Sequence, residues 1–126
     1  VWEAEFTKDA VDLTKVWIRG LAPKFVTPTD LIYGTVSEDH NTITIPIGQV
    51  LPYSSTYNAY FYAADMSQGL IFDETEVPSI DLTREGPDKP FASLKYGWSF
   101  YAVYVSDGTG AGNFDIIVDG VTFTKK

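Results

Sequence analysis

The sequence lacks several residue types and patterns, and each absence excludes a class of function. It has no cysteine among its 126 residues, which excludes thiol catalysis, thiolate metal sites and disulfide bonds. No apolar run approaches the length of about eighteen residues that a membrane-spanning helix needs. Only nine basic residues face seventeen acidic ones, and the resulting net charge of -8 repels phosphate backbones. We therefore expect no membrane-spanning segment and no nucleic-acid partner.

Helical periodicity is also nearly absent. Only residues 8–15 carry apolar side chains at the spacing of even one helical turn. Alternating runs rich in β-branched and aromatic residues recur instead, which predicts an all-β domain of about eight or more strands. The predicted strands are residues 2–6, 15–21, 30–37, 42–51, 57–64, 69–72, 92–105 and 114–124.

Short segments rich in Gly, Pro, Asp and Ser separate these runs. The dipeptide Asp119-Gly120, between Ile117-Val118 and Val121-Thr122, predicts a two-residue type I′ hairpin within the last run. Strands joined in this way favour an antiparallel β-sandwich, with a small closed or partly open, calycin-like β-barrel as the alternative. Apolar residues make up 44% of the chain, enough for one core, so we predict a single domain over residues 1–126.

The stretch "ITIPIGQVL", residues 43–51, breaks a regular alternation. Its three isoleucines point to one face, and continued alternation would carry Gln49 into the core behind them. A buried amide without hydrogen-bond partners is costly. We therefore predict a bulge at Gly48 that turns Gln49 outward and returns Val50 to the core. The alternative is a buried, hydrogen-bonded Gln49.

Three stretches within residues 15–52, "VWIRGL", "IYGTVSEDHNTITIP" and "IGQVL", carry a family resemblance. They resemble segments of cell-surface lipoproteins and secreted β-domains of Bacteroides-type gut bacteria, whose functions are largely unknown. The resemblance implies an extracytoplasmic domain, at the cell surface or in the periplasm, of a longer protein that is lipid-anchored through an upstream segment. The closing residues "FTKK" fit the final domain of such a protein. The resemblance carries over no catalytic residue.

Polar clusters offer few candidates for chemistry. His40, the single histidine, lies in the acidic turn "SEDHN", and adjacent residues of a hairpin turn rarely converge on one metal ion. A serine hydrolase would need this histidine, and no G-x-S-x-G elbow accompanies it. We interpret His40 as a turn residue.

Carboxylates cluster in "DETE", residues 73–76, and in the glycine-rich segment "SDGTGAGNFD". Both segments could bind calcium weakly, yet neither has the spacing of a known calcium loop, and we interpret both as solvated loops. A hydrolase with paired carboxylates remains a nominal alternative, with Asp65, Asp73, Glu74 and Glu76 as its candidates. We expect no enzyme, no bound metal and no cofactor.

Aromatic crowding is the most informative feature. In "KYGWSFYAVYV" and "TYNAYFYAA", alternation places aromatic residues on both faces of an extended strand. The simpler interpretation is a pair of central strands that are covered on both faces. The functional interpretation is that one face stacks against a sugar ring or lines a pocket for an apolar ligand.

We predict a non-catalytic binding module of an exported envelope protein. It would bind a glycan or a small amphipathic molecule through Tyr60, Tyr62, Tyr96 and Trp98. The alternative is a structural or assembly domain of a larger surface lipoprotein. In that case the same aromatic residues pack against a neighbouring domain of the same chain, and there is no small-molecule ligand.

Overall fold

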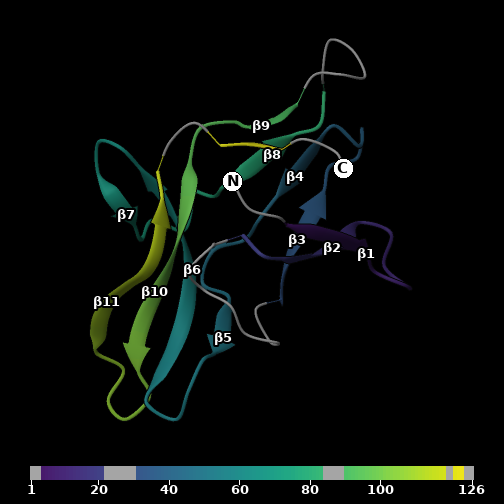
Figure 1. Cartoon of the computed structure of the whole chain (residues 1–126). Coiled ribbons are helices and arrows are strands. Elements are labelled where there is room, and N and C mark those ends of the chain that lie inside the picture. Colours follow the sequence, from purple (N-terminus) through teal and green to yellow (C-terminus); the bar gives the residue numbers. More distant parts are fainter. Residues whose placement is uncertain (1–3, 22–30, 84–89, 119–120, 124–126) are drawn as a thin grey trace.

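The computed structural model describes residues 4–21, 31–83, 90–118 and 121–123. These residues form twelve β-strands and no helix, arranged in two antiparallel sheets (Figure 1). The predicted antiparallel all-β fold is confirmed. No helix long and apolar enough to cross a membrane occurs in the residues that the structure describes.

Sheet A has seven strands and curls strongly. Their spatial order is β1 (Glu5–Lys8), β2 (Lys15–Arg19), β3 (Leu31–Val36), β4 (Thr42–Thr44), β8 (Ser79–Asp81), β9 (Phe91–Ser93) and β12 (Thr122–Phe123). The curl brings the two edge strands together, and the ring of Phe6 in β1 meets that of Phe123 in β12 at 5.7 Å. Sheet A therefore has the character of a half-barrel within a two-layer fold.

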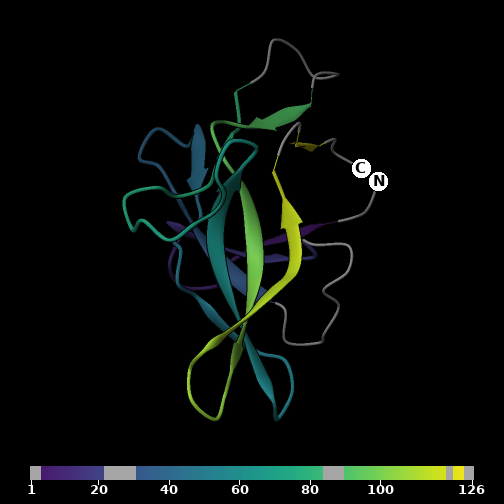
Figure 2. The same cartoon turned by 90° about the vertical axis from the view of Figure 1, so that its left-hand side faces the viewer.

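Sheet B has five strands built around one long antiparallel pair. Its order is β11 (Gly110–Ile117), β10 (Gly97–Tyr104), β6 (Tyr57–Asp65) and β5 (Val50–Pro52), and β7 (Gly69–Ile71) also pairs with β6. The short strands β5 and β7 share the edge of β6 that β10 leaves open. One face of sheet B packs toward sheet A, and the other faces away from it (Figures 1 and 2).

The core lies between the sheets and follows from the period-2 pattern of each strand. In sheet B, Phe61 and Phe100 are buried and their rings meet at 5.6 Å. Sheet A contributes mainly isoleucines, including Ile18 and Ile32. Burial of each such side chain stabilises the fold by about 1.5–3 kcal/mol. The core indole of Trp98 donates its N–H to the carbonyl of Leu21 at 2.7 Å, which satisfies its one polar atom.

Three of the predicted β runs are each divided between the two sheets. Residues 42–51 form β4 in sheet A and β5 in sheet B, and residues 92–105 form β9 in sheet A and β10 in sheet B. The sequence does not predict β8, because three residues are too few to show an alternating pattern. The remaining predicted strands lie close to their predicted positions, although Trp2 is outside the described residues.

The third divided run, residues 114–124, includes the predicted type I′ hairpin. Its turn residues, Asp119 and Gly120, lie outside the described part of the chain. The flanking strands pair elsewhere: β11 pairs with β10 in sheet B, and β12 pairs with β9 in sheet A. The predicted pairing of these two strands with each other is therefore wrong for the described residues.

The predicted bulge at Gly48 is confirmed. Gly48 has a φ of 82°, a conformation that favours glycine. Its amide donates to the carbonyl of Phe61 at 2.7 Å, and the amide of Phe61 donates to the carbonyl of Gln49 at 3.0 Å. Two residues of this segment thus oppose one residue of β6, which defines a bulge.

The predicted consequence of the bulge is wrong, because Gln49 turns inward. Its Oε1 accepts from the Tyr33 amide at 2.9 Å, and its Nε2 donates to the carbonyls of Tyr33 and Pro46 at 2.9 and 2.8 Å. Val50 is 46% exposed, and Leu51 enters the core instead. The reason is tertiary, because β4 pairs with β3 only at residues 43–44. Beyond these residues, the side-chain amide of Gln49 takes the place of a paired strand and forms hydrogen bonds with the backbone of Tyr33 in β3.

Replacement of Gln49 by leucine should therefore destabilise the domain. Gln49→Leu leaves the partly buried amide and carbonyl of Tyr33 without this partner, so we expect a loss of about 1–3 kcal/mol in the free energy of unfolding. Urea denaturation measures the loss. Gln68→Leu, at an exposed position in the turn between β6 and β7, is the matched control and should change stability by less than about 0.5 kcal/mol. Equal losses in both variants would contradict this role of Gln49.

Candidate functional site

The four aromatic residues predicted to bind a ligand do not share one surface. Trp98 is 1% exposed and Tyr96 is 6% exposed, and both belong to buried clusters. Tyr60 and Tyr62 alternate with the buried residues of β6 and point away from the core. Strand alternation is therefore as predicted, but only Tyr60 and Tyr62 can meet a ligand at the surface of this structure.

Further aromatic side chains join Tyr60 and Tyr62 on the outer side of sheet B. Tyr60 lies directly opposite Tyr101 of β10 on one side and Val50 of β5 on the other. Phe72 follows β7 and meets Tyr62 at a centroid distance of 4.8 Å. Figure 2 looks onto this side of β6, β10 and β11. We call the surface formed by Tyr60, Tyr62, Phe72, Tyr101 and Val50 the aromatic face.

The rings of the aromatic face form one connected cluster. Tyr60 and Tyr62 lie nearly parallel, with an interplanar angle of 10° and centroids 6.4 Å apart. Tyr101 contacts Tyr62 at 6.4 Å and Phe72 at 5.6 Å, both edge to face. Phe72 is 56% exposed, whereas the three tyrosines are half-buried. The cluster is thus held by its own ring contacts and still presents apolar surface to water.

Gly110 of β11 leaves room for the Tyr101 ring. A Cβ at Gly110 would lie 2.0 Å from the hydroxyl of Tyr101, so a side chain at this position would displace the Tyr101 ring. Ser99, which pairs with Tyr62, is fully buried on this side and donates its hydroxyl to Asn113 Oδ1. Sequence reasoning left Phe72 and Tyr101 out of the site. The run of glycines at 108, 110 and 112 is the signal that could have indicated Tyr101.

The phenols of the aromatic face influence one another. Burial, followed by the neighbouring phenols of Tyr60 and Tyr101, raises the pKa of Tyr62 above its ordinary value of 10.0. Both effects disfavour the phenolate. At neutral pH the Tyr62 hydroxyl is therefore protonated, and it can donate as well as accept a hydrogen bond.

The carboxylates considered in the sequence take part in turns and local contacts. Asp73 accepts from the amide and hydroxyl of Thr75, which lowers the pKa of Asp73. Glu76 accepts a hydrogen bond from the buried Tyr96 and pairs with Lys95 at 3.9 Å. In the described part of the chain, no group of three or more His, Asp or Glu side chains could hold a metal ion.

His40 lies in a turn, as predicted. It is exposed, with a φ of 61°, and its amide donates to the carbonyl of Ser37 at 2.9 Å. The neighbouring Asp39 accepts from the hydroxyl of Ser37 and the amide of Asn41. Local turn geometry therefore accounts for these polar groups.

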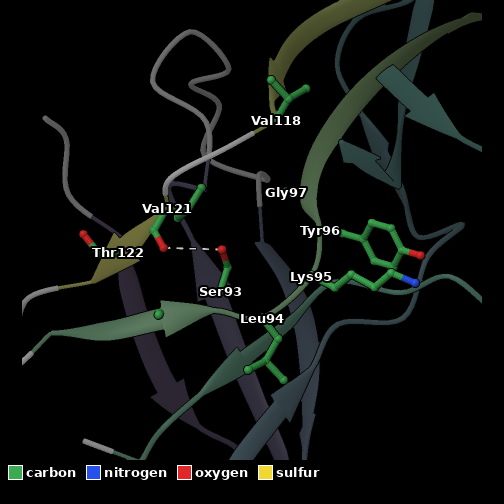
Figure 3. Close-up of a pocket in the computed structure, with 9 residues that line it drawn as sticks. Ser93, Leu94, Lys95, Tyr96, Gly97, Val118, Val121 and Thr122 are labelled. Carbon is green, nitrogen blue, oxygen red and sulfur yellow. Dashed lines mark hydrogen bonds between the residues drawn. The ribbon is translucent and has the colours of Figure 1, made fainter. Parts of the chain in front are cut away.

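A shallow pocket of about 280 Å³ lies near the point where β9 leads into β10 (Figure 3). Its lining includes the stretch from Ala92 to Gly97 together with Val118, Val121 and Thr122. The Ser93 hydroxyl donates to the carbonyl of Val121 at 3.3 Å across it. In Figure 3 the side chains of Lys95 and Tyr96 point away from Ser93 and Val121, so the pocket lacks a convergent set of polar groups. The aromatic face is therefore the stronger candidate.

Comparisons with protein-family models, curated proteins and solved structures find no match for this chain. The resemblance to surface lipoproteins thus stays a prediction, and function has to be argued from the site.

Removal of the Phe72 ring should lower the pKa of Tyr62. Phe72→Ala admits water beside Tyr62, and burial is the largest cause of the raised pKa. A titration of the Tyr62 ring signals by NMR measures the change. Leu13→Ala, which shortens an 80% exposed side chain in another part of the fold, should leave the Tyr62 pKa unchanged.

Because the pKa of Tyr62 is raised in the folded state, the wild-type domain should lose stability as the pH rises through about 10.

Proposed function

We propose that this chain is a non-catalytic binding module and that its aromatic face binds a glycan by stacking. The observation that supports this most directly is the connected cluster of Tyr60, Tyr62, Phe72 and Tyr101 on the outer side of sheet B. Aromatic rings offer an apolar surface to the C–H groups of a sugar ring, and tyrosine hydroxyls add hydrogen bonds at the edge. Contiguous exposed apolar surface of this kind typically marks an interaction site.

The shape of the site favours a sugar ring over a fatty acid or another enclosed ligand. Small apolar ligands usually occupy concave pockets of about 300–1,000 Å³ that bury most of their surface. Two shallow pockets of the described residues are lined by residues 92–97 with 118, 121 and 122, and by residues 4–5 with 19–20. Neither includes a residue of the aromatic face. A ligand on this face would rest against a sheet, which suits the flat side of a saccharide.

The same proposal includes a location outside the cytoplasm, on the cell surface or in the periplasm. It is based on the resemblance of residues 15–52 to exported surface domains. A glycan-binding module at that location would meet free or surface-attached polysaccharides.

A second candidate function is that of a structural domain whose aromatic face packs against a neighbouring domain. The exposure of Phe72 and Val50, at 56% and 46%, favours it, because a covering domain would bury both side chains. The two functions compete for the same surface, so saccharide binding by the isolated domain separates them.

We expect neutral oligosaccharides to shift the NMR signals of the aromatic face in a saturable way. Phe72→Ala and Tyr60→Ala should each weaken binding about five- to tenfold, since a lost stacking contact is worth about 1 kcal/mol. Tyr53→Ala removes a 45% exposed tyrosine in the turn after β5, away from the aromatic face, and should leave the affinity unchanged. Failure of every tested saccharide to bind, or equal loss in Tyr53→Ala, would rule out this function.

A further inference from the structure

Basic residues are distributed very unevenly along the chain. Residues 41–83 and 96–123 contain no lysine, arginine or histidine, and these two segments include every strand of sheet B. The same segments contain the acidic residues Asp65, Asp73, Glu74, Glu76, Asp81, Asp107, Asp115 and Asp119. The sequence that forms sheet B is thus acidic, with Lys95 just before β10 as the basic residue nearest to its aromatic residues in the sequence.

On sheet A, a lysine of the same chain lies over a pair of aromatic rings. The Lys15 ammonium lies 4.7 Å from the ring centre of Trp17 and 4.6 Å from that of Tyr33, on the outer side of sheet A. These distances are within the range of about 6 Å in which a cation is attracted to a ring face. On the aromatic face of sheet B, by contrast, no described basic side chain lies over a ring, and the flanking sequence has none to supply.

One carboxylate lies next to the aromatic face in the sequence. Asp73 directly follows Phe72, and the hydrogen bonds from Thr75 that lower the pKa of Asp73 keep its side chain charged. Asp65, at the end of β6, does not add to this charge, because strand alternation places Asp65 on the side of Phe61 and Ala63, and it lies close enough to Lys95 for their charges to interact. The charge of Asp73 acts at low salt, where the Debye length is about 30 Å, and is screened at high salt.

We propose that the aromatic face prefers a cationic glycan, an oligosaccharide that carries free amino groups, over neutral and acidic glycans. This inference rests on the proposed glycan-binding function and adds the charge class of the ligand. The ring faces and the Asp73 carboxylate both attract a protonated sugar amine. The same carboxylate, together with the net charge of -8, repels uronic acids and sulfated sugars.

The test compares three β-1,4-linked hexasaccharides that share a gluco backbone: cellohexaose, the glucosamine hexamer and the glucuronic acid hexamer. Affinities are measured by NMR titration of the wild-type domain at slightly acidic pH, where the sugar amines are protonated. We expect the glucosamine hexamer to bind most tightly and the glucuronic acid hexamer most weakly, with about a tenfold difference at low salt. The difference should shrink towards unity in about 1 M salt, where the Debye length is about 3 Å.

A matched pair of variants assigns the preference to this face. Asp73→Asn keeps a residue type that can form the same turn, and it should reduce affinity for the glucosamine hexamer about two- to threefold while leaving cellohexaose binding unchanged. Asp107→Asn is the control, because Asp107 makes the same contacts to Thr109 that Asp73 makes to Thr75. It lies in the turn between β10 and β11, at the lower end of the molecule and well below β7 in Figure 1. Asp107→Asn should change neither affinity.

The outcomes separate this inference from the function on which it rests. Equal affinity for the three hexasaccharides, or tightest binding of the acidic one, overturns the charge preference and leaves glycan binding intact. No binding of any hexasaccharide overturns both. Binding of the glucosamine hexamer that persists unchanged in Tyr60→Ala and Phe72→Ala also overturns the inference, because the amine would then be held elsewhere on the acidic surface.

Discussion

The antiparallel pairing of β6 with β10 is the constraint on which the rest of the structure depends. It runs in unbroken register from Gly97 opposite Ala64 to Tyr104 opposite Tyr57. Because alternate residues of a strand face opposite sides, this one pairing sends Phe61 and Phe100 into the core and leaves the tyrosines of the aromatic face outside. The long pair thus builds the core and the candidate site at the same time, and a change of register by one residue would exchange them.

The two sheets are connected by strand runs that change sheet, at residues 45–49, at residues 94–96 and between the end of β11 and the start of β12. Such points leave backbone groups without ladder partners, and specific side chains compensate. The Gln49 amide bonds both backbone groups of Tyr33 beyond the end of β4. At Gly97, a Cβ would lie 1.7 Å from the Ile117 carbonyl oxygen, so only glycine lets β10 begin beside the end of β11. The chain has no disulfide, and the connections between its sheets therefore depend on a few specific local contacts.

The outer surfaces of sheet A and sheet B both carry aromatic residues, but the charges near these residues differ. Trp17 and Tyr33 on sheet A hold the chain's own Lys15, and the Trp17 indole also donates to Asp9 at 2.8 Å. Both rings of this pair thus have a cation from the same chain as a partner. The aromatic face of sheet B has ring contacts of its own, no basic side chain of the described residues lies over its rings, and it is formed by an acidic stretch of sequence. This contrast is the physical basis for proposing a ligand on sheet B and a structural role for the aromatic pair on sheet A.

The sequence by itself determined the all-β class, most strand positions, the bulge at Gly48 and the division of aromatics between two strand faces, because these depend on local periodicity and turn chemistry. It could not decide which face of β10 is core, since both faces are apolar, and so it grouped Trp98 with Tyr60 although they lie on opposite sides of sheet B. The position of Phe72 beside Tyr62 and the hydrogen bonds of Gln49 to Tyr33 were decided only by the tertiary structure. Both depend on which strands become neighbours, and contacts between segments distant in sequence leave no periodic signal in either segment.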